Sequence, residues 1–312
     1  MIKKFLPPHP LRTPILFLVF NRPDLTERVL SEIRKAKPTR LYLASDGPRD
    51  GKEGENDLVH KVREIVKSVD WPCEVKTLLR EKNLGCKHGV SEAITWFFEQ
   101  EEQGIILEDD CLPSQSFFWF CEELLDKYKN SDVSMISGYT IVEENSEIPY
   151  RFSNLMNIWG WASWKRSWEH YSVNLDAKSI NQNSHIFSRF LGHSDNEKKK
   201  FIQFVEKKVE TWDMQWIFSC MKNYNYAILP TKSLIKNIGF DKRATHTQNT
   251  HKLYESVSRK EITFPIKHIE NKNLYEMNVL DQKYLSVLNK KDYLKYLFNI
   301  MTNTIKLIKF KK

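Results

Sequence analysis

A chain of 312 residues with 41% hydrophobic and 28% charged residues is long enough to bury a core and has the composition of a globular protein. It contains no run of about 18 apolar residues, so no membrane-spanning helix is expected, and its N-terminal segment lacks the apolar core of a signal peptide. The formal net charge is +8, but residues 289–312 hold seven lysines and one aspartate, so a broad nucleic-acid groove elsewhere is not indicated.

Strands and helices alternate over the first 140 residues. After the first apolar run ends at a turn, Leu25, Val29 and Ile33 follow at helical spacing. The predicted strands are 13–23, 40–56 (whose later part is a glycine- and proline-rich loop), 73–85, 104–110 and 133–139, and the predicted helices are 24–37, 57–69, 86–100 and 114–128. This alternation predicts an α/β fold with a parallel sheet.

Polar side chains follow four of these strands. They are Arg22, Asp46, Asn83 and the triplet Glu108–Asp110. Ligands of open α/β sheets bind outside the carboxyl ends of the strands, so we expect these side chains to lie at one site.

The alternation fails after residue 150. Residues 157–171 contain four tryptophans in ten positions, residues 210–223 predict a helix, and residues 226–240 predict a strand and a loop. The segment 247–290 is polar and weakly patterned, and the sequence has no internal repeats. The five cysteines form no C-x-x-C pair, which indicates reduced thiols and a cytoplasmic protein.

The three adjacent carboxylates of Glu108–Asp110 need a compensating charge. Mg²⁺ or Mn²⁺ prefers oxygen ligands and is commonly held by one or two carboxylates together with phosphate oxygens. Such a metal would neutralise a diphosphate leaving group. The alternative interpretation is a solvated acidic turn that caps the following helix.

Four segments of the sequence carry a family resemblance. They are "FNRP" after the first strand, "SDGPR" after the second, "NLGCKHGV", and "ILEDDCLPSQSFFWF". In this order they resemble a GT-A-fold glycosyltransferase, and the most similar pattern is the N-acetylglucosaminyltransferase I type. The resemblance covers about residues 13–250. It implies a Rossmann-like α/β fold with a mixed central sheet flanked by helices, and a nucleoside-diphosphate sugar as donor.

The resemblance also implies roles for the donor side of the site. It assigns the divalent metal to Asp110, and it places Glu108 and Asp109 near the sugar and the ribose. The residues that match nucleotide contacts are Arg22, Asp46 and His88. The segment "SDGP" departs from the family pattern, so uracil is expected as the base but is not fixed.

The acceptor side is predicted from the second half of the chain. Inverting sugar transfer needs a general base, and the resemblance implies Asp213, between Trp212 and Trp216. The alternative is that these tryptophans form a core stripe with a solvated Asp213 beside them. Further residues assigned to this side are Trp161 and Trp212 for contact with acceptor or sugar, Arg243 for the phosphates, and His246 for the phosphates or the metal, with His251 as a second choice for His246.

The C-terminal residues 289–312 predict a basic amphipathic helix. Its apolar positions are Leu294, Leu297, Met301, Ile305 and Ile308, and its lysines lie largely off that stripe. Such a helix suits an anionic membrane surface, which would make the protein peripheral on the inner face of the membrane. Docking on its own domain or on a second subunit is the equal alternative.

The sequence therefore predicts a metal-dependent glycosyltransferase with two regions. The transferase domain is 1–288, with a nucleotide-sugar-binding half at 13–140 and an acceptor-binding half at 141–288, and the tail is 289–312. The donor is a nucleoside-diphosphate sugar, such as a UDP-sugar, and the acceptor is a glycan or a lipid-linked hydroxyl of polysaccharide biosynthesis. The alternatives are a sugar nucleotidyltransferase, although no glycine-rich loop follows the first strand, and a glycan- or nucleotide-binding protein without catalysis.

Overall fold

The structure is a computed structural model, and it describes residues 5–175, 211–224, 226–240, 254, 256–270, 277, 279–281 and 283. The predicted residues Arg243 and His246, the second choice His251, and the tail 289–312 lie outside the described residues. Within the part that is described, no helix combines the length and the apolar character needed to cross a membrane.

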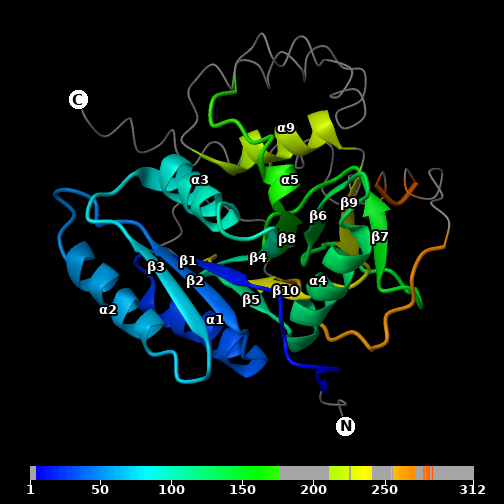
Figure 1. Cartoon of the computed structure of the whole chain (residues 1–312), viewed down its shortest axis with the longest axis horizontal. Coiled ribbons are helices and arrows are strands. Elements are labelled where there is room, and N and C mark those ends of the chain that lie inside the picture. Colours follow the sequence, from blue (N-terminus) through cyan, green and yellow to red (C-terminus); the bar gives the residue numbers. More distant parts are fainter. Residues whose placement is uncertain are drawn as a thin grey trace.

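A mixed sheet of eight strands forms the centre of the protein (Figure 1), in the order β3-β2-β1-β4-β8-β6-β9-β7. The strands are β1 Ile15–Val19, β2 Arg40–Ser45, β3 Glu74–Leu79, β4 Gln103–Glu108, β6 Val133–Ser137, β7 Tyr150–Ser153, β8 Trp161–Trp164 and β9 Tyr226–Pro230. Strands β1 to β4 run parallel to one another, whereas β8 is antiparallel to both β4 and β6, and β7 is antiparallel to β9. This arrangement confirms the predicted α/β class with a mixed central sheet.

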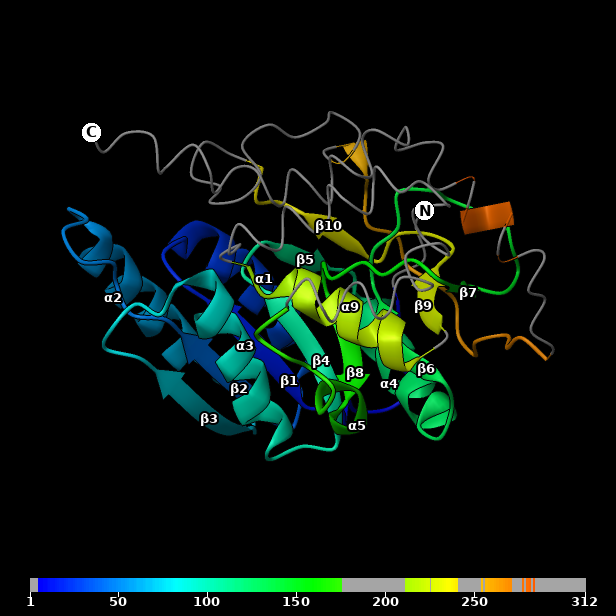
Figure 2. The same ribbon diagram turned by 90° about the horizontal axis from the view of Figure 1, so that it is seen from above.

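Helices cover both faces of the sheet, as the view from above shows (Figure 2). They are α1 Pro23–Ala36, α2 Glu55–Lys67, α3 Gly85–Phe98, α4 Gln115–Tyr128, α5 Lys165–Trp168 and α9 Asp213–Asn223. Helix α1 packs against α2 and α4 on one face, and α3 packs against α5 on the other. The predicted apolar stripe of α1 is its buried side, since Leu25, Val29 and Ile33 are at most 3% exposed.

The strand β8 was not anticipated from the sequence, which indicated only an aromatic patch there. All four of its residues are buried, because it lies inside the sheet between β4 and β6 with helices on both sides. Before it, Gly160 has a φ of +63°, and a Cβ there would stand 2.5 Å from the side chain of Ile235. Glycine therefore lets the chain turn into β8. Strands β7, β8 and β9 all come from residues after 140, so the two predicted halves share one sheet.

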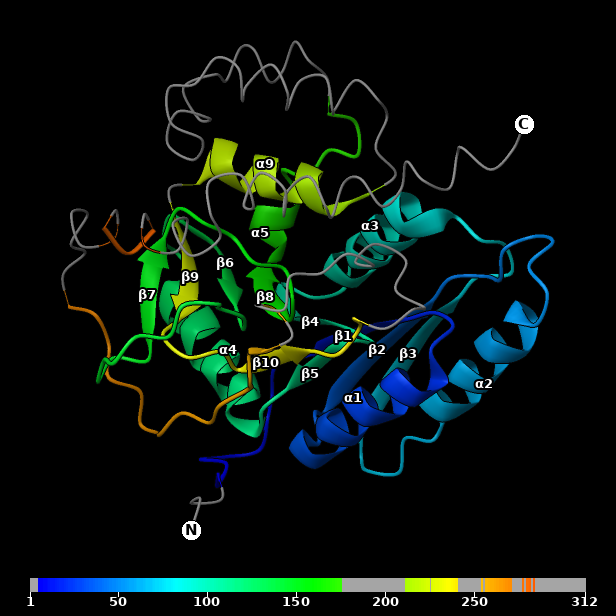
Figure 3. The same cartoon turned by 180° about the vertical axis from the view of Figure 1, so that it is seen from behind.

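A small second sheet pairs β5 (Cys111–Pro113) with β10 (Ile235–Asn237) in antiparallel register. It lies between α1 and α4, as both the front and the rear views show (Figures 1 and 3). Because β5 directly follows the acidic triplet, β10 brings a late part of the chain up to that triplet.

A second late segment, residues 256–262, is tied to the start of α4. The carboxylate of Glu261 accepts hydrogen bonds from the backbone N–H groups of Gln115 (3.0 Å) and Ser116 (2.8 Å). The backbone N–H of Ile262 donates to the Ser116 hydroxyl (3.0 Å). The residue before α4, Ser114, makes no side-chain cap of its own, so Glu261 satisfies donors that would otherwise lack a partner at this helix end.

Candidate functional site

The carboxyl ends of β1 and β4 meet at one edge of the sheet, and oppositely charged side chains pair there. Arg22 follows β1, and its Nε donates to Asp109 Oδ2 at 3.3 Å. Its Nη2 forms ion pairs with Asp109 Oδ1 and, at 3.0 Å, with Asp110 Oδ2. The side chains of Arg22, Asp109 and Asp110 are 15%, 4% and 16% exposed. The charge opposite the acidic triplet is therefore an arginine of the same chain.

Burial and mutual repulsion raise the carboxylate pKa values in this triplet. Burial, followed by the charges of Asp110 and Asp109, raises the pKa of Glu108 to about 8. Burial also raises the pKa of Asp109, to about 6, against the lowering effect of Arg22. Burial lowers the pKa of Arg22, but the two aspartates outweigh it and hold the guanidinium charged. The acidic triplet therefore holds three carboxyl groups against the single positive charge of Arg22.

The position of Asp110 is fixed from the side of β10. The backbone N–H of Ile238 donates to the backbone oxygen of Asp110 at 2.8 Å, and that of Gly239 donates to Asn237 Oδ1 at 2.8 Å. A Cβ on Gly239 would stand 2.3 Å from Asp110 Oδ2, so no other residue fits without displacing this carboxylate. The sequence drew attention to Gly239 only as part of a loop segment.

Asp110 is compatible with the predicted Mg²⁺ or Mn²⁺. Among the described residues, no group of three or more His, Cys, Asp or Glu side chains is arranged to hold a metal ion by itself. A magnesium site completed by phosphate oxygens needs only one or two carboxylates. Asp110 supplies hard oxygen donors and keeps part of its surface exposed, so it fits as a protein ligand of the ion. Its carboxylate would then contact both the ion and the guanidinium of Arg22.

Asp213 is the first residue of α9 and lies close to the acidic triplet. It is 4% exposed, and its Oδ1 accepts hydrogen bonds from the Thr211 hydroxyl and from the backbone N–H of Met214, the latter at 2.8 Å. Its charge contributes to the raised pKa of Glu108. Asp213 therefore lies within electrostatic reach of Glu108, although the two are 105 residues apart in the sequence, and its role as a base stays a prediction.

Cys86, at the start of α3, was not singled out from the sequence. Burial raises the pKa of its thiol well above the usual value, and the charges of Glu108, Asp213, Asp46 and Asp110 raise it further. The thiol therefore stays neutral, and it lies within electrostatic reach of all four carboxylates. No local signal in the sequence distinguishes this cysteine from the others.

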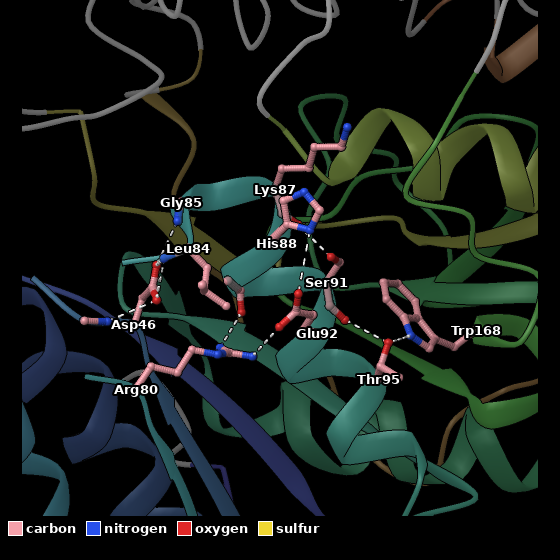
Figure 4. Close-up of polar contacts among 12 residues, drawn as sticks. Asp46, Arg80, Leu84, Gly85, Lys87, His88, Ser91, Glu92, Thr95 and Trp168 are labelled. Atoms are coloured by element: carbon pink, nitrogen blue, oxygen red, sulfur yellow. Dashed lines mark hydrogen bonds and ion pairs between the residues drawn. The ribbon is translucent and has the colours of Figure 1, made fainter. Parts of the chain in front are cut away.

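Asp46 and His88 lie around the N-terminus of α3 (Figure 4). The carboxylate of Asp46 accepts backbone hydrogen bonds from Gly47 (3.0 Å), Leu84 (3.0 and 3.1 Å) and Gly85 (3.1 Å). It therefore holds the loops after β2 and β3 together and caps α3. The ring of His88 is 48% exposed, with Nδ1 3.7 Å from Glu92 Oε1 on the next turn. Contact of either residue with a nucleotide stays a prediction.

Trp161 and Trp212 lie inside an aromatic cluster. They are 1% and 2% exposed, with ring centroids 5.9 Å apart, and Trp161 also packs at 5.3 Å against Trp216. A sugar ring would reach either indole only if this cluster opened. The arrangement gives both residues a packing role, which is the core-stripe alternative for Trp212, and their predicted contact with substrate gains no support from it.

Glu55, the first residue of α2, joins the loops after β1 and β2. Its carboxylate accepts hydrogen bonds from Asn21 Nδ2 (2.9 Å) and from the backbone N–H of Arg49 (2.8 Å). The guanidinium of Arg49 pairs with both of its oxygens and lies 5.5 Å over the ring of Phe20. Sequence reasoning missed this group, because a glutamate after a glycine-rich loop is usually a solvated residue.

No protein-family model matches the chain, and no curated protein matches it. Solved structures do resemble it. An apo UDP-glucose pyrophosphorylase matches with a TM-score of 0.39 at 11% identity, covering 79% of this chain and 96% of its own. The 4-diphosphocytidyl-2C-methyl-D-erythritol synthase of Anaerococcus prevotii matches with a TM-score of 0.31 at 11% identity, over 61% of this chain and 84% of its own.

The inositol-1-phosphate CTP transferase of T. maritima matches with a TM-score of 0.30 at 13% identity, covering 56% of this chain and 82% of its own. These three structures are named for pyrophosphorylase, synthase and nucleotidyl-transfer activities, and none of the three is named as a glycosyltransferase. The resemblance to the N-acetylglucosaminyltransferase I type is therefore not confirmed by them. Scores of this size transfer neither an activity nor a ligand to this chain.

Proposed function

We propose that this protein is a transferase that binds a nucleoside-diphosphate sugar at the carboxyl edge of β1, β2 and β4. The observation that carries the proposal is the convergence of Arg22 with Glu108, Asp109 and Asp110 at the end of β4. A cation beside a carboxylate, both partly exposed, suits a diphosphate that is bridged by a metal ion. The site lies where ligands of open α/β sheets bind.

Glycosyl transfer is the reaction that these side chains support best. Asp109 holds the guanidinium of Arg22 beside Asp110, where it can contact phosphate oxygens. Glu108, at the end of β4, can form a hydrogen bond with a sugar hydroxyl. Asp213, as general base, would remove the proton from the acceptor hydroxyl. The acceptor we propose is a hydroxyl of a glycan or of a lipid-linked sugar.

Asp110 would hold Mg²⁺ or Mn²⁺ in this proposal. When bound there, the ion neutralises the charge that develops on the departing diphosphate. Arg22 contacts the same carboxylate, so it supplies a second positive charge at that position.

Sugar nucleotidyl transfer is the second candidate. It needs the same nucleotide and phosphate contacts, and nucleotide transfer is the kind of activity named for compared structures such as the CTP transferase of T. maritima. It breaks a phosphoanhydride bond of the nucleotide, whereas glycosyl transfer breaks the bond between sugar and diphosphate. Only Phe20, Asn21 and Arg22 join β1 to α1, without a glycine. This short loop favours glycosyl transfer, because a phosphate-cradling loop is usually glycine-rich.

One experiment separates the candidates. The protein is incubated with Mn²⁺ and a panel of nucleotide-sugars, with and without pyrophosphate, and the products are followed by ³¹P NMR. Release of the nucleoside diphosphate supports glycosyl transfer or donor hydrolysis. Formation of the nucleoside triphosphate from pyrophosphate supports nucleotidyl transfer. Binding without either product supports a binding protein.

The variant Asp213→Asn tests the base assignment. It should lose at least a hundredfold in transfer, the usual contribution of a general base, while its affinity for the donor changes little. The exposed Asp70→Asn serves as the matched control, since Asp70 pairs with Arg34 at the surface. Transfer by Asp213→Asn at the rate of the control would reject the assignment.

A further inference from the structure

We propose that the guanidinium of Arg49 is the platform on which the base of the bound nucleotide stacks. This inference rests on the proposed function and adds the residue that contacts the base. It uses the group formed by Phe20, Asn21, Arg49 and Glu55, to which the sequence motifs assign no role.

The guanidinium of Arg49 is rigidly held. Arg49 Nε lies 3.1 and 3.0 Å from the two oxygens of Glu55, and Nη2 also pairs with Oε1. The backbone N–H of Arg49 donates to the same carboxylate at 2.8 Å. The Glu55 side chain is 3% exposed, so backbone and head group of Arg49 are both fastened to a buried anchor. Little conformational freedom is left to lose when a ligand arrives.

The guanidinium of Arg49 lies over the ring of Phe20, and the side chain is still accessible. The ring of Phe20 supports it from one side at 5.5 Å. The Arg49 side chain nevertheless stays 39% exposed. The hydrogen bonds to Glu55 use the Nε and Nη2 edge of the guanidinium, so the exposed part of its flat surface remains for a ligand. Planar guanidinium groups stack on aromatic rings, and a nucleobase is such a ring.

The guanidinium of Arg49 is linked to the phosphate side of the site through the loop after β1. Phe20, under the guanidinium, is two residues before Arg22, and its backbone N–H lowers the pKa of Asp109 by hydrogen bonding to it. Asn21, between them, donates to Glu55 at 2.9 Å. The loop after β1 is therefore fastened to the acidic triplet at one side and to the Arg49–Glu55 pair at the other. A nucleotide whose diphosphate contacts Arg22 has its base end within reach of the loop after β2.

The chemistry distinguishes this role from phosphate binding. Glu55 neutralises Arg49 and uses the edge with which an arginine usually grips a phosphate. What Arg49 offers is a face, and stacking tolerates every base, since each has a π-face. The platform should therefore raise the affinity for all nucleotides alike, and selectivity among bases must come from other groups.

The test measures affinity by calorimetry for UDP, GDP and pyrophosphate, all with Mg²⁺ present. The proteins are the full chain, Arg49→Ala, Arg49→Lys and the control Arg34→Ala. The control removes another arginine that forms an ion pair, here with Asp70 at the surface. We expect Arg49→Ala to bind both UDP and GDP about tenfold more weakly, as for the loss of one stacking contact. Pyrophosphate should bind it as it binds the unchanged chain. Arg49→Lys should resemble Arg49→Ala, because lysine keeps the charge but has no flat face.

Two results would overturn the inference alone. The first is an unchanged affinity of Arg49→Ala for UDP. The second is an equal loss of affinity for UDP and for pyrophosphate, which would indicate that only the charge of Arg49 matters. A circular-dichroism melt of each variant confirms that the protein compared is folded, and Arg49→Lys, the milder change, carries the test if Arg49→Ala does not fold. If the unchanged chain binds neither UDP, GDP nor pyrophosphate, the proposed function itself fails together with this inference.

Discussion

Replacing Gly239 by alanine should displace Asp110 and so separate the stability of the fold from nucleotide binding. The new Cβ would stand 2.3 Å from Asp110 Oδ2 and 2.9 Å from its Cβ and Cγ. The backbone of this segment cannot easily retreat, because Ile238 is hydrogen-bonded to Asp110 and β10 is paired with β5. The carboxylate must therefore rotate away from Arg22. Overpacking of this kind costs about 1–3 kcal/mol in the free energy of unfolding.

The measurements are the melting temperature by circular dichroism and the affinity for UDP with Mn²⁺ by calorimetry. The matched control is Gly104→Ala at the other end of β4, where a Cβ would stand at the same 2.3 Å, from the ring of Phe97. We expect both variants to melt several degrees lower, since each kcal/mol corresponds to about 2–4 °C in chains of this size class. Only Gly239→Ala should also lose UDP affinity, by about tenfold or more. A folded Gly239→Ala that binds UDP like the control would refute the reasoning that Asp110 must keep this position.

Two further predictions concern buried carboxylates that anchor the fold. Glu122 Oε2 accepts three hydrogen bonds at 2.7–2.8 Å from Arg12 and Thr13. Glu122→Ala should therefore lower the free energy of unfolding, measured by urea titration, by about 3 kcal/mol. A loss below about 0.5 kcal/mol would contradict this anchor role. Burial raises the pKa of Glu55, but the hydrogen bonds and the charge of Arg49 outweigh burial and hold this pKa below its usual 4.5. The stability that its carboxylate contributes is therefore complete above about pH 5 and is lost as the pH falls through the lowered pKa. The difference in unfolding free energy between the unchanged chain and Glu55→Gln should be flat from about pH 5 to 7 and shrink below about pH 4; a difference that grows on acidification would show that the sign is wrong.

The first half of the fold was readable from the sequence because its signals are local. Strands β1, β2 and β4 are largely apolar runs, β3 precedes a turn signal, and each helix carries an apolar stripe, so β1 to β4 and α1 to α4 were expected close to where they lie. The strand β8 could not be anticipated in the same way. Its alternation is hidden, since Trp161 and Trp164 are buried as fully as the small residues between them. Only its neighbours β4 and β6, which are distant in sequence, make this segment a strand.

The site likewise has a part that the sequence predicted and a part that it did not. The triplet after β4 and Arg22 after β1 were predicted to lie together because parallel strands end at one edge, and they do pair. The partner of each group was not predictable. The compensating charge was expected to be a metal, whereas the described residues place the guanidinium of Arg22 there. The contacts of Glu55 and Gly239 depend on which loops come together in three dimensions, and no spacing in the sequence encodes that.

The contact between Glu261 and the start of α4 has a consequence for how the chain is made. During synthesis, α4 emerges from the ribosome well before the carboxylate that satisfies its first N–H groups exists. Strands β9 and β10 are also made late. Until then, the N-terminal part of the chain has an incomplete central sheet, and the first N–H groups of α4 lack their carboxylate partner. Such a portion is prone to sticking to other nascent chains. A chain released early, before residue 261, would expose those same groups permanently, which makes premature termination here more damaging than the loss of a peripheral segment.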